Sequence, residues 1–122
     1  MKATATGIKR IINAFGYSCA GFKQTFKSEA AFRQDLALCA VLFVVSLFLN
    51  VTAVEWILMT ASLFFILFME LVNTAIEAII DRISADYHEL SKKAKDIGSL
   101  LVLMAFIMMF IVWGRILFSK FW

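Results

Sequence analysis

Four polar side chains, three of them acidic, recur along an otherwise apolar part of the chain. They are Glu70, Asn73, Glu77 and Asp81. Their spacings of three, four and four residues place them on one face of a helix. A carboxylate that faces lipid costs several kcal/mol unless it meets protein, water or a cation. An acidic stripe in this setting therefore indicates a functional site.

Glu70 is the member of this stripe that solvation explains least well. Glu77 and Asp81 fit a location at the headgroup level of a membrane, where charges cost little. Glu70 lies about 16 Å from Asp81 along the helix, and an unpaired charge at that depth would be severely penalised. We therefore expect Glu70 to be neutral, paired with another group or beside an aqueous cleft.

A second glutamate is predicted at the membrane level of Glu77. Glu29 lies at the start of the first long apolar stretch. Mg²⁺ is typically held by one or two carboxylates plus phosphate oxygens, so Glu29 and Glu77 could share a divalent cation that accompanies a nucleotide. Polyphosphate could also bind nearby side chains, although a solvated loop is the default explanation for them. These side chains are Asp86, His88, Glu89, Lys95 and Asp96.

The composition indicates that a lipid bilayer surrounds these residues. Of the 122 residues, 62% are hydrophobic, 17% are charged and none is proline, and the mean hydropathy is +0.87. A soluble domain averages about 45–50% apolar and about 25% charged residues, so this chain has too little polar surface for a soluble domain. The same figures exclude a disordered segment. A net charge of +3 is too small to indicate nucleic-acid binding.

The predicted fold is an all-α membrane protein that forms a single domain over residues 1–122. Residues 6–27 place apolar side chains at intervals of three and four, with Lys9 and Arg10 beside them. This pattern predicts an amphipathic helix at the membrane surface, which anchoring alone would explain. Three transmembrane helices are expected in addition, because three stretches are long enough to cross about 30 Å of hydrocarbon. They cover about 30–49, 54–82 and 93–120.

The distribution of positive charge predicts the orientation of these spans. All but two of the twelve Lys and Arg residues, Lys2 among them, fall before the uncharged part of the first span, which begins at Leu36, or in the 81–96 segment. The exceptions are Arg115 and Lys120. The positive-inside rule then places the N-terminus and the 81–96 segment in the cytoplasm, with the C-terminus on the periplasmic side. Because three spans enclose little interior, we expect an oligomer with sites where protomers meet.

Short motifs extend along most of the chain. The Glu70–Glu77 segment reads ELVNTAIE and precedes Asp81 and Arg82, and further motifs are EAAFRQ at 29–34, YHELS at 87–91 and AKDIGS at 94–99. Together they resemble the bacterial integral-membrane diacylglycerol kinases, a family whose length and number of spans also agree. Ile80 stands where the family often has valine, and Asp35 where it has glutamate. Neither departure changes the expected chemistry.

The resemblance implies an architecture and a reaction. The architecture is a homotrimer of three-span protomers in the bacterial inner membrane, with each active site shared between neighbouring subunits at the cytoplasmic interface. In the reaction, ATP phosphorylates the primary hydroxyl of diacylglycerol to give phosphatidic acid. Glu70 would be the general base, and Glu29 and Glu77 would hold the Mg²⁺ that accompanies ATP.

Further residues would bind the two substrates. Asn73 would support Glu70 or the phosphates of ATP. Ser99 and Trp113 would line the lipid side, together with Arg10 and Glu70. The nucleotide site would contain Glu29 and Glu77 with Arg10, Tyr17, Asp86, His88, Lys95 and Asp96.

The chemistry of phosphoryl transfer fits these residue types. The reaction needs an acceptor oxygen aligned with the γ-phosphate and cations where negative charge accumulates. Lys95, Arg10 and a metal ion could supply those cations. A carboxylate beneath the headgroups could accept the proton of a hydroxyl that never leaves the lipid, and Glu70 is placed for that.

Other functions remain open at this point. A related kinase that phosphorylates undecaprenol would use the same carboxylates, because any membrane-embedded primary alcohol presents the same hydroxyl. A small oligomeric, proton-coupled transporter would explain Glu70 but leave Lys95 and Asp96 unexplained. A non-enzymatic assembly module would not account for Glu70.

Overall fold

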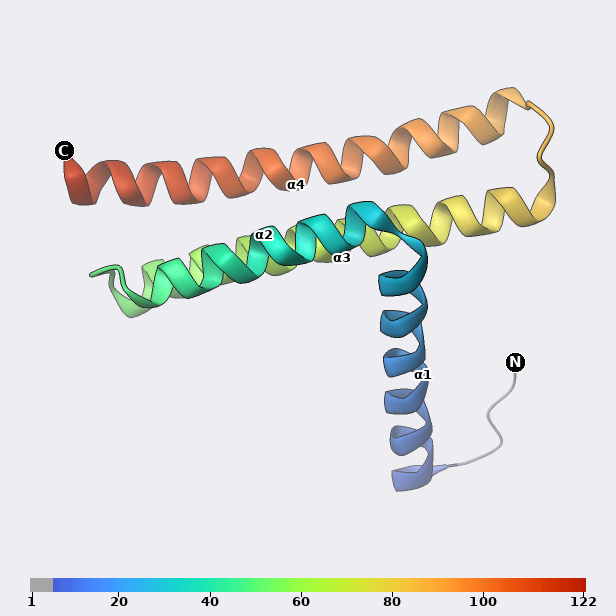
Figure 1. Cartoon of the computed structure of the whole chain (residues 1–122), viewed down its shortest axis with the longest axis horizontal. Helices are drawn as coiled ribbons and strands as arrows, with labels where there is room; N and C mark the ends of the chain where they lie inside the picture. The colour runs from blue at the N-terminus through green and yellow to red at the C-terminus, as the bar shows by residue number, and fades with distance from the viewer. Residues whose placement is uncertain (1–5) are drawn as a thin grey trace.

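Four helices make up residues 6–122, the part of the chain that the computed structural model describes (Figure 1). They are α1 (Gly7–Ser28), α2 (Ala30–Leu47), α3 (Ala53–Ile83) and α4 (Glu89–Phe121). The predicted all-helical fold is confirmed. Lys2, which contributes to the predicted orientation, lies outside the described residues.

Three of these helices, α2, α3 and α4, are long and apolar enough to cross a membrane. α3 has 31 residues and α4 has 33, so at 1.5 Å per residue they measure roughly 46 and 50 Å. The hydrocarbon core of a bilayer is only about 30 Å thick. Both helices therefore extend beyond it, and their connected ends carry much of the charge of the chain.

The connection between α3 and α4 is shorter than the sequence suggests. The polar stretch 81–96 is predicted as a loop, but only residues 84–88 lie between the two helices. α4 begins at Glu89, before the expected start near 93, because His88 caps the helix: its Nδ1 accepts a hydrogen bond from the backbone N–H of Leu90 at 3.0 Å. Most of the polar stretch is therefore helical, which fixes its side chains on defined helix faces.

α3 is the helix against which both α2 and α4 pack, and α4 runs antiparallel to it (Figure 1). The core lies along the seam between α3 and α4, where Met59, Ile66 and Ala105 are fully buried. Trp113 links α4 to α3 within this seam, because its Nε1–H donates hydrogen bonds to the carbonyl oxygen of Met59 and to Ser62 Oγ, both at 3.2 Å. The seam holds the acidic face of α3 at a fixed position relative to α4.

α1 meets α2 at a sharp bend and projects sideways from the other three helices (Figure 1). Glu29 has an extended backbone and separates the two helices. Arg33 Nη1 donates hydrogen bonds to the carbonyl oxygens of Phe26 at 2.6 Å and Lys27 at 3.1 Å. These carbonyls belong to the last turn of α1, which has no helical partner for them. Arg33 therefore ties the end of α1 to the first turn of α2.

Candidate active site

The carboxyl group of Glu70 is buried beside a cavity formed by three helices. Glu70 is 6% exposed and lines a cavity of about 420 Å³ with Asp35 of α2, Asn73 of α3 and Ser99 of α4. The remaining lining residues are Ala31, Val102, Leu103 and Phe106. A carboxylate in a cavity with both polar and apolar walls is suited to accept a proton from a hydroxyl group that enters from the lipid.

A second cavity, of about 520 Å³, brings the two predicted metal ligands together. Glu29, which lies between α1 and α2, and Glu77 of α3 both line it. Asp81 and Lys95 line the same cavity, and α1 contributes side chains that include Gln24. This arrangement places carboxylate oxygens and an ammonium group around one space, which is the combination that a metal-bound polyphosphate requires.

A third cavity, of about 360 Å³, lies where the 84–88 connection joins α3 and α4. It is lined by Asp86, His88 and Asp96, all of which are predicted nucleotide-site residues. Asp81 and Lys95 also line this cavity, so the pair borders both polar cavities. Lys95 Nζ lies 2.8 Å from Asp81 Oδ1. The structure thus gathers most of the predicted nucleotide residues around this ion pair.

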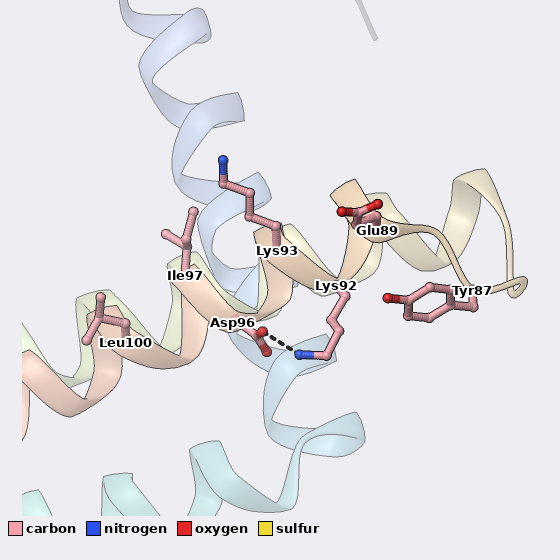
Figure 2. A pocket seen from close by; sticks show the side chains of 7 residues that line it. All are labelled: Tyr87, Glu89, Lys92, Lys93, Asp96, Ile97 and Leu100. Atoms are coloured by element: carbon pink, nitrogen blue, oxygen red, sulfur yellow. Dashed lines mark hydrogen bonds and ion pairs between the residues drawn. The ribbon is translucent and has the colours of Figure 1, made fainter.

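An outer groove of about 340 Å³ lies along the first turns of α4, next to the third cavity (Figure 2). Its two lysines point in different directions: Lys92 reaches Asp96, whereas Lys93 extends away from that pair (Figure 2). Lys92 Nζ lies 2.7 Å from Asp96 Oδ2, and both residues also line the third cavity. The groove contains neither of the predicted metal ligands, so the Glu29–Glu77 cavity is the better candidate.

Three predicted site residues line none of the cavities described above. Arg10 and Tyr17 belong to α1, are exposed and are not among the residues that line the cavities above. Trp113 is 5% exposed in the seam with α3, about 21 Å along α4 from Ser99. Ser99 itself lines the Glu70 cavity. Within one chain, therefore, the structure brings Ser99 to Glu70 but does not bring Trp113, Arg10 or Tyr17 there.

Comparison with known proteins identifies the family. Residues 16–117, which cover all of α2 and α3, match the family model described as prokaryotic diacylglycerol kinase. This chain belongs to the prokaryotic diacylglycerol kinase family. The resemblance carried by the motifs is thereby confirmed, and so is the prediction that the protein is a kinase.

The alignments with curated relatives cover nearly the whole length of this chain and of each relative. The diacylglycerol kinase of Escherichia coli is 42% identical over 121 residues, which is 99% of each chain. That of Haemophilus influenzae is 44% identical over 113 residues, covering 93% of this chain and 96% of its own. That of Pseudomonas aeruginosa is 48% identical over 112 residues, covering 92% and 91%. The similarity therefore includes all four helices.

The acidic side chains of the kinase fit a metal ion that is bound together with a nucleotide. Among the described residues, no group of three or more His, Cys, Asp or Glu side chains is arranged to hold a metal by itself. Glu29 and Glu77 line one cavity as a pair, and Mg²⁺ in nucleotide sites takes one or two carboxylates with phosphate oxygens. The donor set therefore suits Mg²⁺ that arrives with ATP.

The sequence interpretation did not include Asp35 in the site. In the kinase structure Asp35 lines the Glu70 cavity from α2. The signal that singled out Glu70, an acid inside a predicted span, applies equally to Asp35. The sequence pattern does not single out Asp35 because this residue is isolated, whereas Glu70 belongs to a stripe of polar residues on one helix face.

Proposed function

We propose that this family member transfers the γ-phosphoryl group of ATP to the primary hydroxyl of diacylglycerol, giving phosphatidic acid. The observation that carries the proposal is the buried position of Glu70 in a cavity between helices that are long enough to span a membrane. A lipid hydroxyl reaches such a cavity from the bilayer, while a nucleotide reaches the polar cavities from water. The curated relatives named diacylglycerol kinase support the choice of acceptor.

In this proposal Glu70 is the general base. Its carboxylate accepts the proton of the acceptor hydroxyl as the oxygen attacks phosphorus. Asn73 lies one helical turn further along α3, lines the same cavity and supports Glu70 or the transferred phosphoryl group. On the lipid side we assign Ser99 and Trp113, together with Arg10. The support is strongest for Ser99, because it lines the cavity of Glu70.

The nucleotide binds between α1, α3 and α4. Glu29 and Glu77 hold the Mg²⁺ that accompanies ATP, and the ion supplies positive charge where negative charge develops on the phosphates. Lys95 lies between the two polar cavities and adds a cation. Since phosphoryl transfer depends mainly on alignment and charge stabilisation, these residues need only position the γ-phosphate towards Glu70. The remaining nucleotide residues are Arg10, Tyr17, Asp86, His88 and Asp96.

The assembly that completes this site is a homotrimer in the inner membrane. α1 lies in the membrane interface through its apolar side chains, of which Ile8, Ile11 and Phe15 are strongly exposed. Arg10 and Tyr17 lie on the same helix, away from the cavities of their own chain, which supports a site shared between subunits. The excess of Lys and Arg near the α3–α4 connection and in the N-terminal segment supports a cytoplasmic location for both.

One reconstitution experiment tests the proposed reaction. The purified protein is placed in lipid vesicles with Mg-ATP labelled at the γ-phosphate, and diacylglycerol and undecaprenol are compared as acceptors. We expect label in phosphatidic acid at a much higher rate than in undecaprenyl phosphate. The reverse preference would make the protein an undecaprenol kinase. Transfer to neither lipid would overturn the proposed reaction.

Subunit mixing tests whether the site is shared. Glu70→Gln subunits are co-reconstituted with Glu77→Gln subunits after each variant has been shown to be impaired alone. If the two glutamates act across an interface, mixed trimers contain one intact site and regain part of the activity. Absence of any recovery would place both residues of each site in one protomer.

A further inference from the structure

A close approach between α3 and α4 lies directly beside the Glu70 cavity. Gly98 is buried in α4, and a β-carbon added there would overlap Asn73 Oδ1 and lie 3.2 Å from Asn73 Cγ. The other described glycines have no such neighbour within 4 Å. Any side chain at position 98 would therefore displace the Asn73 amide, whereas the hydrogen of glycine leaves room for it.

The contact also explains the unusual environment of the Asn73 side chain. Asn73 Oδ1 is buried and has no conventional hydrogen-bond partner among the described residues. A Cα hydrogen of Gly98 occupies the direction of the missing β-carbon and so points at this oxygen. A Cα–H group is a weak hydrogen-bond donor, and an amide oxygen can accept a hydrogen bond from it. An amide NH₂ group is itself a donor, so in the same place it would repel the Cα–H group. The oxygen is therefore the end of the amide that belongs in the seam.

The opposite end of the Asn73 amide, its NH₂ group, is available to the Glu70 cavity. Asn73 lines the Glu70 cavity together with Ser99, the neighbour of Gly98 in α4. With the oxygen held against Gly98, the NH₂ group is the part of Asn73 available to that cavity. An NH₂ group donates two hydrogen bonds and accepts none, so its partners there are hydrogen-bond acceptors such as carboxylate, phosphoryl or hydroxyl oxygens.

We propose that Gly98 is a positioning residue of the kinase. By leaving space for Asn73 Oδ1 in the α3–α4 seam, it directs the Asn73 NH₂ group to donate to the Glu70 carboxylate or to an oxygen of the transferred phosphoryl group. The inference rests on the proposed function and assigns a role to a residue that takes no part in the reaction itself. Displacement of such a donor by about 1 Å can lower a rate by as much as about 100-fold.

The first test is Gly98→Ala, with Gly114→Ala as the matched control. Both glycines lie in α4, but a β-carbon at Gly114 meets nothing within 4 Å. Alanine is the better helix former at both positions, so helix propensity does not explain a loss at Gly98. In vesicles with diacylglycerol, we expect kcat of Gly98→Ala to fall by about 10- to 100-fold with little change in KM for Mg-ATP. Gly114→Ala should match the wild-type protein.

The second test separates positioning from a general packing effect. In an Asn73→Ala background, the atom of residue 73 nearest to a β-carbon at Gly98 is the Asn73 Cα, at an ordinary 3.6 Å. If Gly98 acts through Asn73, Gly98→Ala then causes no further loss of kcat, so the two effects are strongly non-additive. The double variant should also recover any thermal stability that Gly98→Ala alone has lost. Losses that multiply, or a double variant that still fails to fold, would overturn the inference.

A third variant tests which end of the amide is used. Asn73→Asp keeps an oxygen over Gly98 but replaces the cavity-facing donor with an acceptor, so we expect kcat to fall at least as far as in Asn73→Ala. Wild-type activity in Asn73→Asp would contradict the assigned orientation. An active wild-type protein that tolerates Gly98→Ala would overturn this inference alone, whereas a wild-type protein that phosphorylates no lipid would overturn the proposed function.

Discussion

Lys95 Nζ lies 2.8 Å from Asp81 Oδ1, and this ion pair joins α4 to α3 at the boundary between the two polar cavities. Both side chains are substantially exposed, at 42% and 66%. Exposed ion pairs contribute only about 0–1 kcal/mol to stability, because water and salt screen them. The significance of the pair is therefore positional: Asp81 keeps the ammonium group of Lys95 between the Glu29–Glu77 cavity and the residues around His88.

Replacing Asp81 with asparagine tests this relationship. We expect Asp81→Asn to change the free energy of unfolding by less than about 1 kcal/mol, while KM for Mg-ATP rises several-fold because Lys95 is no longer held at the nucleotide. Steady-state kinetics and chemical denaturation in the same detergent provide the two measurements. Asp81→Glu, which keeps a carboxylate within reach of Lys95, is the control. An unchanged KM would remove Asp81 from the site.

The proposed general-base role of Glu70 predicts a specific kinetic defect. Glu70→Gln preserves the shape of the side chain but cannot accept a proton, so kcat should fall by about 10²- to 10⁴-fold while nucleotide binding is retained. Glu55→Gln provides a matched control near the other end of α3. There the Glu55 carboxylate accepts a hydrogen bond from the backbone N–H of Thr52 at 2.9 Å and completes a helix cap. A normal rate for Glu70→Gln would reject the base assignment.

The fold was largely predictable because the hydrophobic pattern determines where helices of this kind form. Three apolar stretches of spanning length correspond to α2, α3 and α4. The 81–96 segment was wrongly predicted as a loop, since the apolar pattern begins only after the charged turn, whereas α4 begins at the cap provided by His88. A helix cap depends on the geometry of a single residue, so the periodicity of apolar residues does not predict where the cap lies.

The candidate site was predictable only where helix spacing or motif resemblance linked its residues. The acidic stripe placed Glu70 and Glu77 on one face, and both line cavities in the structure. Asp35 comes from another helix, and no spacing within α3 points to it. The contact between Gly98 and Asn73 joins residues 25 positions apart, so it depends on the register of α4 against α3. The sequence pattern does not determine that register.

The pairing of Glu29 with Glu77 predicts a change in metal dependence. Because Mg²⁺ in this type of site relies on only one or two protein carboxylates, Glu77→Gln should shift the Mg²⁺ dependence of activity to a higher concentration at fixed ATP. Glu89→Gln makes the same charge change near the α3–α4 connection, outside the Glu29–Glu77 cavity, and should leave the dependence unchanged. Identical Mg²⁺ titrations for the two variants would contradict the metal assignment.

The bend between α1 and α2 predicts that one arginine controls the position of α1. Arg33→Gln removes hydrogen bonds to the carbonyl oxygens of Phe26 and Lys27. α1 then becomes less firmly oriented, and since Arg10 and Tyr17 are carried on α1, KM for Mg-ATP should rise more than kcat falls. Limited proteolysis by trypsin should also cut faster in this region. Arg115→Gln, an arginine replacement in α4, is the control, and equal cleavage rates in both variants would contradict the proposed role of Arg33.

The position of Trp113 gives a test of the lipid-side assignment. Its indole N–H donates to the carbonyl oxygen of Met59 and to Ser62 Oγ within the α3–α4 seam, so Trp113→Phe should lower the free energy of unfolding by about 1 kcal/mol. Trp122→Phe, at a strongly exposed aromatic residue of the same end of the chain, should have little effect on stability. The kinetic measurement is KM for diacylglycerols of different chain length. If Trp113 acts only through the seam, that KM stays constant; a rise that depends on chain length, with no loss of stability, would place the indole against the lipid instead.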